Sequence, residues 1–544
     1  MRGLTFTLAA WSQALVLATA ALADQQIEMP VISERVEVTV INVDVVVNDR
    51  QGKPVQGLTA NDFEILEDDQ PQPISNFSEI KLAPPQSSQS PSTGSTARAA
   101  VQPRRRFVFF VDNFSIHPFH RHRVFEGAKE FLRTNLGPSD EAMIVSWNRR
   151  LKIAVPPTHD LTHLESGFNE VLKDVSVAPG SGFERDQFLR ELSQDRERAA
   201  TNARMQARMA SNDLQQSVRA INTLLSRLAG VDGRKILVLV SEGLPMQPGR
   251  EFFDAIENDA AGGPGTSSLL EAQEFNSAKL IDSIATAANA AGVTIYAIHP
   301  GGPGSLPSAE DSEPGSMRSR DVSTANSIES LTHVSQMTGG LVTSRTNNFA
   351  SAFARLSADL SSYYSLGYRS TTRHQDRQRN LRVRTKDGTY SVRTRKSFVE
   401  RSTESQMRER VVANLFFPVS ENGMRILAEL GRSRGLRKRG EVSVPVKIAV
   451  PMDSLTILPS GNQQIAGFSV LLAGVDKNDS VTPLVEKTHR IRFPTSDLPK
   501  TKGSHFIYTL DVHTSRGNRL SVAVVDEISK ATGFTTLQVP DRLP

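Results

Sequence analysis

Acidic and hydroxyl side chains follow two apolar runs that have the composition of buried strands. Asp112 ends the run FVFFVD, and Glu242 follows the run KILVLVS (235–241). In an open α/β sheet, ligands bind outside the carboxyl ends of the strands, so both carboxylates are expected at one edge. Oxygen ligands suit a hard cation such as Mg²⁺. The pattern predicts a cation site or, alternatively, side chains that cap helices and hydrogen-bond to loop amides.

Histidines form a second pattern. His117, His120 and His122 lie in HPFHRHR just after Asp112, and two further histidines stand four residues apart at 159 and 163. Imidazole clusters of this kind can hold zinc or copper. No HExxH signature accompanies them, so polar loop and helix-start residues are the alternative interpretation.

Ser433 lies in GRSRG, which matches the G-x-S-x-G nucleophile motif. That motif works only where a strand delivers the serine and a helix leaves it. Here the preceding residues have a helical pattern and LRKRG follows. We therefore interpret the match as chance.

The elements expected to position these groups alternate between strands and helices. Near-continuous apolar strands separated by helices are typical of a parallel sheet covered on both faces, and they predict a doubly wound, Rossmann-like α/β domain over residues 105–400. Residues 183–213 are rich in Arg, Glu, Gln and Ala and predict a long, largely exposed helical insertion. Residues 381–398, with Asp387-Gly388 at a turn, predict a closing β-hairpin. The expected strands are 107–112, 142–147, 151–155, 235–241 and 293–299.

Regions rich in β-branched residues flank this domain. Residues 30–82 predict an N-terminal β-sandwich, and the Pro/Ser-rich segment 83–104 predicts a linker. Residues 411–544 predict a C-terminal β-sandwich of immunoglobulin-like character. The chain therefore has the pattern of three domains.

Composition restricts the class of protein. The 544 residues include no cysteine, which excludes disulfide scaffolds and Cys-ligated metal sites. With 63 basic and 59 acidic side chains, the net charge of +4 does not indicate a nucleic-acid-binding protein. Residues 1–23 have a basic start, an apolar core and a small-residue end, and they predict a signal peptide cleaved after Ala23. An uncleaved membrane anchor and an ordinary buried helix are the alternative interpretations. We expect a periplasmic or secreted product with no membrane span after signal removal.

Several ordered segments together resemble the von Willebrand factor A (VWA)-related proteins abundant in Acidobacteria. They are the string VINVDVVVNDRQGKPVQGLTANDFEILEDDQPQPISNF, the strands FVFFVDNFS and KILVLVSEG, GVTIYAI, TGG, and YYSLGY with the Arg-rich segment after it. The resemblance covers roughly residues 36–400. It implies a Rossmann-like domain with a metal-ion-dependent adhesion site at the carboxyl ends of the strands.

The sequence departs from the family's metal motif. Where the family has Asp-x-Ser-x-Ser, this chain has Asp112-Asn113-Phe114-Ser115-Ile116, and its Thr-Asp-Gly turn is replaced by Ser241-Glu242-Gly243. Asp112, Ser115 and Glu242 are the best candidates for a residual Mg²⁺ site. Ser211 and Asn212 are the nearest candidates for the missing threonine ligand. Two lost hydroxyl ligands should weaken the binding of so small a cation.

The sequence predicts an exported, non-enzymatic interaction protein that binds a protein partner through the strand-end edge of its α/β domain. A structural component of the cell envelope is one alternative, favoured if Phe114 and Ile116 pack that edge. A secreted hydrolase using the histidines or Ser433 is the other. It requires Ser433 to lie at a strand-to-helix turn near a histidine, whereas the binding hypothesis requires Asp112 and Glu242 to converge. Nothing in the sequence identifies the partner or the oligomeric state.

Overall fold

A computed structural model describes most of the chain. The described residues are 40–81, 104–174, 182–259, 267–303, 313, 315–370, 375–417, 422–436, 441–477 and 479–541. The predicted signal peptide, and the predicted linker apart from its last residue, lie outside these ranges. No helix within these ranges is long and apolar enough to cross a membrane.

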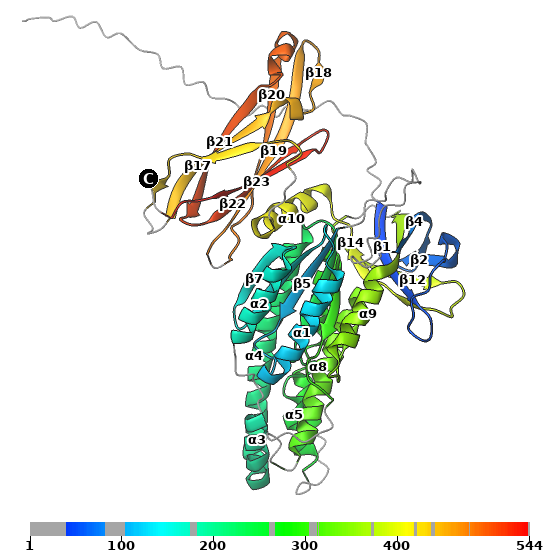
Figure 1. Ribbon diagram of the computed structural model, residues 1–544. Coiled ribbons are helices and arrows are strands. Elements are labelled where there is room, and N and C mark those ends of the chain that lie inside the picture. Colours follow the sequence, from blue (N-terminus) through cyan, green and yellow to red (C-terminus); the bar gives the residue numbers. More distant parts are fainter. Residues whose placement is uncertain are drawn as a thin grey trace, which may run out of the picture. The chain divides into compact units, whose positions relative to one another are not determined.

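A six-stranded sheet forms the centre of the α/β domain (Figure 1). The strand order is β10-β9-β8-β5-β6-β7, and all neighbours are parallel except β6 and β7. Successive elements therefore return to the sheet through helical crossovers. The strands are β5 (Arg105–Val111), β6 (Glu141–Trp147), β7 (Leu151–Thr158), β8 (Arg234–Val240), β9 (Val293–Ile298) and β10 (Val342–Thr343).

Helices cover both faces of this sheet. Phe107 and Phe109 of β5 pack into one core cluster, and Val108 and Phe110 pack into the other, which is why the strand is apolar throughout. The first cluster includes residues of α1 (Pro118–Asn135), α2 (Leu161–Lys173) and α9 (Phe349–Ser361), and the second those of α4 (Arg196–Ala229), α7 (Ala278–Ala291) and α8 (Ser316–Thr338). A mixed architecture of an α/β domain with β-rich parts is therefore confirmed.

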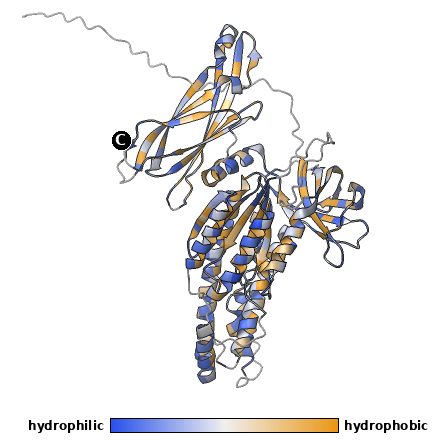
Figure 2. Ribbon diagram, viewed as in Figure 1, coloured by the Kyte–Doolittle hydropathy of each residue, from blue (hydrophilic) through white to orange (hydrophobic). Residues whose placement is uncertain are grey.

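The predicted helical insertion is helical, but it is less exposed than we expected. It consists of α3 (Gly182–Gln194) and the first half of α4, with a break at Asp195, which caps α4 through its carboxylate. Figure 2 shows mainly hydrophilic colours here, yet Phe188 and three alanines of α4 are buried. They pack against Phe252 and Phe253 of α5 (Arg250–Glu257) and against α6 (Ser267–Glu274). Small alanine side chains supply this core, which is why a search for large apolar residues misses it.

Strands from two distant parts of the sequence build the first β-sandwich. One sheet has the order β13-β1-β11-β4, and the other has the order β14-β12-β2-β3. A shared core joins the two sheets, so we call this domain the split sandwich. Its strands are β1 (Val40–Asn48), β2 (Phe63–Glu67), β3 (Gln70–Gln72), β4 (Ile74–Lys81), β11 (Ser362–Arg369), β12 (Gln378–Thr385), β13 (Ser391–Arg393) and β14 (Ser397–Val399).

This pairing corrects two of the boundaries predicted from sequence. The sequence predicts residues 362–399 to belong to the α/β domain (105–400), but β11 lies between β1 and β4 and completes the split sandwich. The hairpin expected at 381–398 also differs, because β12 pairs with β2 and β14 whereas β13 pairs with β1. Gly388 still forms the turn with a φ of 66°. The chain crosses there from β12 in one sheet to β13 in the other, and buried apolar residues of both sheets form one shared core.

The C-terminal region contains a second pair of packed sheets. One sheet contains β15-β17-β16 and β21, and the other contains β18-β19-β22-β23 and β20. The expected boundary at residue 411 lies inside α10 (Thr403–Phe416), whose Val411 and Leu415 share a core cluster with the α/β domain. The strands are β15 (Leu427–Leu430), β16 (Arg434–Gly435), β17 (Glu441–Pro451), β18 (Leu458–Ser460), β19 (Gln463–Val475), β20 (Val485–Pro494), β21 (His505–Ser515), β22 (Arg519–Asp526) and β23 (Thr532–Gln538).

Candidate functional site

The loop that follows β5 is fixed by buried hydrogen bonds. The amides of Ser115 and Ile116 both donate to the carbonyl of Asp112, at 3.1 Å. Arg121, on α1, is buried and donates to the carbonyls of Asn113 and Ile116, each at 3.1 Å. The Asn113 side chain donates to the carbonyl of Val171, at 2.9 Å. The loop is therefore preorganised, and one basic residue of the HPFHRHR segment has a structural role.

Asp112 lies at the centre of a hydroxyl network at the carboxyl end of the sheet. Its Oδ2 accepts hydrogen bonds from the hydroxyls of Ser115 and Ser241, both at 2.7 Å. The Ser115 hydroxyl also accepts from the amide of Glu242, at 3.2 Å. Burial raises the pKa of Asp112 to about 6, against the effect of these hydrogen bonds. Asp112 and Glu242 thus converge at this edge, as the binding hypothesis requires.

Gly243 allows the two loops to approach. A Cβ atom at this position would lie 2.1 Å from the Cβ of Ser115, so no larger residue fits without movement. Its amide donates to the Ser241 hydroxyl, at 3.1 Å. The glycine of the Ser-Glu-Gly turn is therefore required by the contact between the two loops.

The side chains present do not fit the family's cation site. Phe114 and Ile116, which stand where the VWA-related proteins have the two motif serines, are buried in the core clusters on opposite faces of the sheet. Asp112 directs Oδ2 at two hydroxyl donors, and the carboxylate of Glu242 is held by other partners. Among the described residues, no group of three or more His, Cys, Asp or Glu side chains could hold a metal ion.

Glu242 pairs with the first histidine cluster. One carboxylate oxygen accepts from the amide of His117, at 3.1 Å, and the other lies 2.6 Å from His120 Nδ1. His299, directly after β9, is buried nearby, and burial lowers its pKa although Glu242 acts in the opposite direction. His299 is not among the site residues predicted from the sequence. Its signal in the sequence is a polar residue that ends a third buried strand at the same edge.

The remaining candidates lie elsewhere. Ser211 and Asn212 are within α4, and neither is hydrogen-bonded to Asp112, Ser115 or Ser241. His122, His159 and His163 are exposed. Ser433 lies between β15 and β16, which both pair with β17, so it is not at a strand-to-helix turn. The residues before it, expected to be helical, form a strand.

We expect Mg²⁺ to leave the protein unchanged. Because Asp112 and Glu242 already have protein donors, millimolar Mg²⁺ should shift the melting temperature by less than about 1 °C. Calorimetric titration of wild type and Asp112→Ala with Mg²⁺ and Mn²⁺ provides the second readout. A melting shift present in wild type and lost in Asp112→Ala would contradict this expectation and establish a cation site.

Comparisons with known proteins give no family assignment. No protein-family model matches the chain, and no match was found among curated proteins. Among solved structures, an aerotolerance-related membrane protein from Bacteroides fragilis is 8% identical, covers 47% of this chain and 98% of its own, and has a TM-score of 0.22. The conserved hypothetical protein BatB from Bacteroides thetaiotaomicron is 9% identical, with 48% of this chain and 97% of that chain covered and a TM-score of 0.22. Proximal thread matrix protein 1 from the mussel byssus is 12% identical, with 49% of each chain covered and a TM-score of 0.24. These TM-scores are too low to support an argument.

Proposed function

We propose that this chain is an exported, VWA-related interaction protein whose α/β domain binds a protein partner without a metal ion. The binding surface is the strand-end face, defined as His117, Phe119, His120 and Glu242. Its scaffold is the doubly wound sheet order together with the convergence of two loops at the carboxyl edge. An aromatic anchor, Phe119, beside the hydrogen-bonded His120 and Glu242 takes the place of a bridging cation.

Phe119 is the observation that carries this proposal. It lies in the first turn of α1 and is 81% exposed, the most exposed large apolar side chain among the described residues. Its ring lies 5.2 Å from that of His117, which in turn lies 5.2 Å from that of His120. Leaving an aromatic ring in water has a free-energy cost of about 2 kcal/mol that burial against a partner removes. Aromatic residues are also enriched among the residues that dominate binding energy.

The surroundings indicate the chemistry of the partner. His122 and Arg123 are exposed on the same end of α1, whereas Glu242 is occupied by His120. A partner surface with an apolar pocket for Phe119 and acidic side chains around it would complement this face. The partner is therefore an acidic protein surface that binds without a bridging cation.

A photo-crosslinking amino acid at position 119 tests the proposal in the native host. We expect it to crosslink to one defined protein. The same amino acid at position 270, where Leu270 of α6 is 68% exposed, should not crosslink to that protein. With the purified partner, Phe119→Ala should weaken binding by about tenfold or more, because truncating a buried aromatic anchor costs about 2 kcal/mol. Leu270→Ala should bind as wild type does. Equal affinity for Phe119→Ala and wild type would reject the proposal.

The structural alternative has its own support. Phe114 and Ile116 fill the core at the positions where the family has metal-ligating hydroxyls. An envelope component that needs only the fold would tolerate that replacement. The crosslinking experiment separates the two, because a structural role at another surface predicts no product specific to position 119.

A further inference from the structure

A polar cavity lies at the opposite end of the α/β sheet from the strand-end face. Its volume is about 480 Å³, and it opens between the sheet β13-β1-β11-β4 of the split sandwich and the first residues of β8 and β9. Arg234 begins β8, whereas Ser241 follows the end of that strand. We call this cavity the junction pocket. Its volume is in the range of small-molecule sites.

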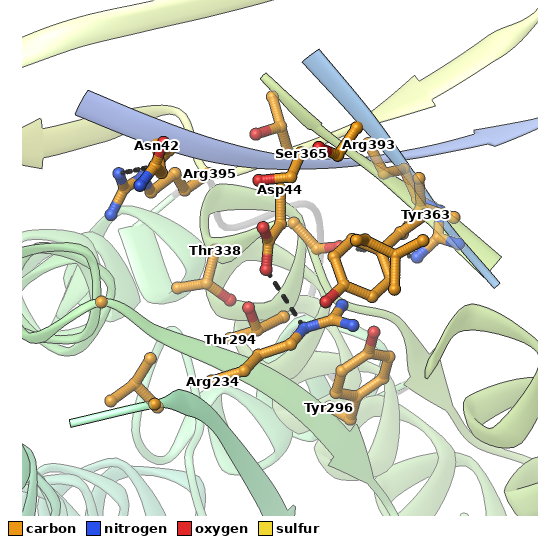
Figure 3. Close-up of a pocket in the computed structure, with 18 residues that line it drawn as sticks. Asn42, Asp44, Arg234, Thr294, Tyr296, Thr338, Tyr363, Ser365, Arg393 and Arg395 are labelled. Atoms are coloured by element: carbon orange, nitrogen blue, oxygen red, sulfur yellow. Dashed lines mark hydrogen bonds and ion pairs between the residues drawn. The ribbon is translucent and has the colours of Figure 1, made fainter. Parts of the chain in front are cut away.

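Figure 3 shows polar side chains from both domains facing this cavity. Arg234, Thr294 and Tyr296 come from the α/β sheet, and Asp44 and Tyr363 come from the split sandwich. The Arg234 guanidinium lies over the Tyr363 ring, 3.9 Å from its centroid. Aromatic packing on one side of a guanidinium fixes its orientation and leaves its N–H groups available at the edge.

The charges around the junction pocket leave an excess of positive charge. Of its three arginines, Arg234 has an ion pair with Asp44 at 3.2 Å, and Arg393 has one with Asp359 at 2.7 Å. Arg395 donates to the carbonyl of Asn42 at 2.8 Å, and no ion pair of Arg395 exists within the part of the chain that the structure describes. Asp44 and Asp359 therefore balance two of the three arginines, and the positive charge of Arg395 has no paired carboxylate among the described residues.

Several of these N–H groups are buried without an acceptor. The Arg234 side chain is 8% exposed, and its Nε and Nη1 make no hydrogen bond, since the Asp44 contact is an ion pair without hydrogen-bond geometry. The Nε of Arg395 is buried and lacks an acceptor as well. Leaving a buried charged donor unsatisfied is costly, and a ligand oxygen would remove that cost. Guanidinium groups form their strongest hydrogen bonds with carboxylate and phosphate oxygens.

We propose that the junction pocket binds a small organic anion through a phosphate or carboxylate group held by Arg234 and Arg395. The hydroxyls of Thr294, Thr338 and Ser365 also line the pocket and would hydrogen-bond to hydroxyl groups of the same ligand. The size and the polar lining select a compact, hydroxylated anion. This site is independent of the partner-binding face, because it uses other residues at the other end of the sheet.

Titration calorimetry of the full mature chain tests the site. The probes are inorganic phosphate, citrate, glucose 6-phosphate and uncharged glucose, at constant ionic strength. We expect binding of at least one anion and none of glucose. Tighter binding of phosphate and glucose 6-phosphate than of citrate would indicate a phosphate ligand, and the reverse order would indicate a carboxylate ligand.

Variants of Arg395 test whether this guanidinium holds the anion. Arg395→Met should weaken anion binding by about tenfold or more, because it removes a charge-assisted contact without stranding a carboxylate. Arg395→Lys keeps the charge and should lie between wild type and Arg395→Met. Arg384→Met, an exposed arginine of β12, should bind as wild type does. No anion binding by wild type, or equal binding by wild type and a folded Arg395→Met, would overturn the proposal.

Discussion

Replacing Arg379 with methionine is expected to destabilise the split sandwich by about 3–5 kcal/mol, because it removes the counterion of a buried carboxylate. The side chains of Arg379 and Glu67 are 2% and 1% exposed and form an ion pair. Arg379 also donates to the Ser370 hydroxyl, at 2.6 Å, and lies 3.5 Å from Glu400. One guanidinium thus lies between two carboxylates, of which Glu67 is almost fully buried and Glu400 is 10% exposed.

The same two strands provide the control for this prediction. Arg384 of β12 lies directly opposite Glu64 of β2, and its Nε lies 2.6 Å from that carboxylate, but the side chains are 60% and 30% exposed. Solvent screens such a pair, so Arg384→Met should cost less than about 1 kcal/mol.

Hydrogen exchange of the β2 and β12 amides measures the stability of this sheet in both variants, since the exchange rates of these amides depend on the free energy of its local opening. The double variant Glu67→Gln/Arg379→Met should recover at least half of the loss, because it removes the uncompensated charge as well. Equal exchange rates in Arg379→Met and Arg384→Met would show that burial adds nothing to this pair.

The α/β sheet could be predicted from the sequence because its signals are local. Each parallel strand is buried on both faces, so runs such as Phe107–Val111 are apolar at every position. The polar residues that follow these runs, Asp112 and Glu242 among them, predict which loops lie together at the edge of the sheet. The geometry of the edge follows from strand order alone.

The split sandwich could not be predicted because its pairing is non-local. Tyr364 of β11 packs between Phe63 and Phe77 and hydrogen-bonds to the carbonyl of Val55, about three hundred residues earlier in the chain. Nothing in the local pattern distinguishes a strand that closes the α/β domain from one that completes an earlier sheet. The junction pocket escaped prediction for the same reason, since its residues come from both regions.

The site also shows the limit of motif comparison. Ser115 stands one residue out of the family's register, yet its hydroxyl reaches Asp112 because the loop turns tightly at Asn113. The sequence predicted a weakened cation site on the basis of missing hydroxyls. The structure instead has two hydroxyls, from Ser115 and Ser241, which hydrogen-bond to the carboxylate itself.

Lys235→Met should change how the stability of the α/β domain depends on pH. Lys235 is the second residue of β8, and its ammonium group donates to the carbonyls of Val231 and Ala229, at 2.8 and 3.4 Å. Burial lowers its pKa from 10.5 to about 8, although Asp232 and Glu409 act in the opposite direction. The folded protein therefore releases this proton at a lower pH than the unfolded chain does.

The sign of the effect follows from proton binding. Below pH 8 both states are protonated, and the free energy of unfolding does not depend on this group. Between pH 8 and 10.5 the unfolded chain binds more protons, so stability rises with pH. Because methionine has no proton to release, the free energy of unfolding of wild type should rise relative to Lys235→Met by about 2–3 kcal/mol between about pH 7 and pH 10.

Urea unfolding followed by the fluorescence of Trp147, a buried residue of the same sheet, gives these free energies at each pH. Lys152→Met, at an exposed lysine of β7, is the matched control and should keep a constant difference from wild type. A constant difference for Lys235→Met as well would mean that the ammonium group remains solvated in the folded state. The two hydrogen bonds that Lys235→Met removes contribute a constant difference in the free energy of unfolding below pH 8, where the side chain is protonated in both states. The rise between pH 8 and 10.5 comes from the desolvation of the amine in the folded state.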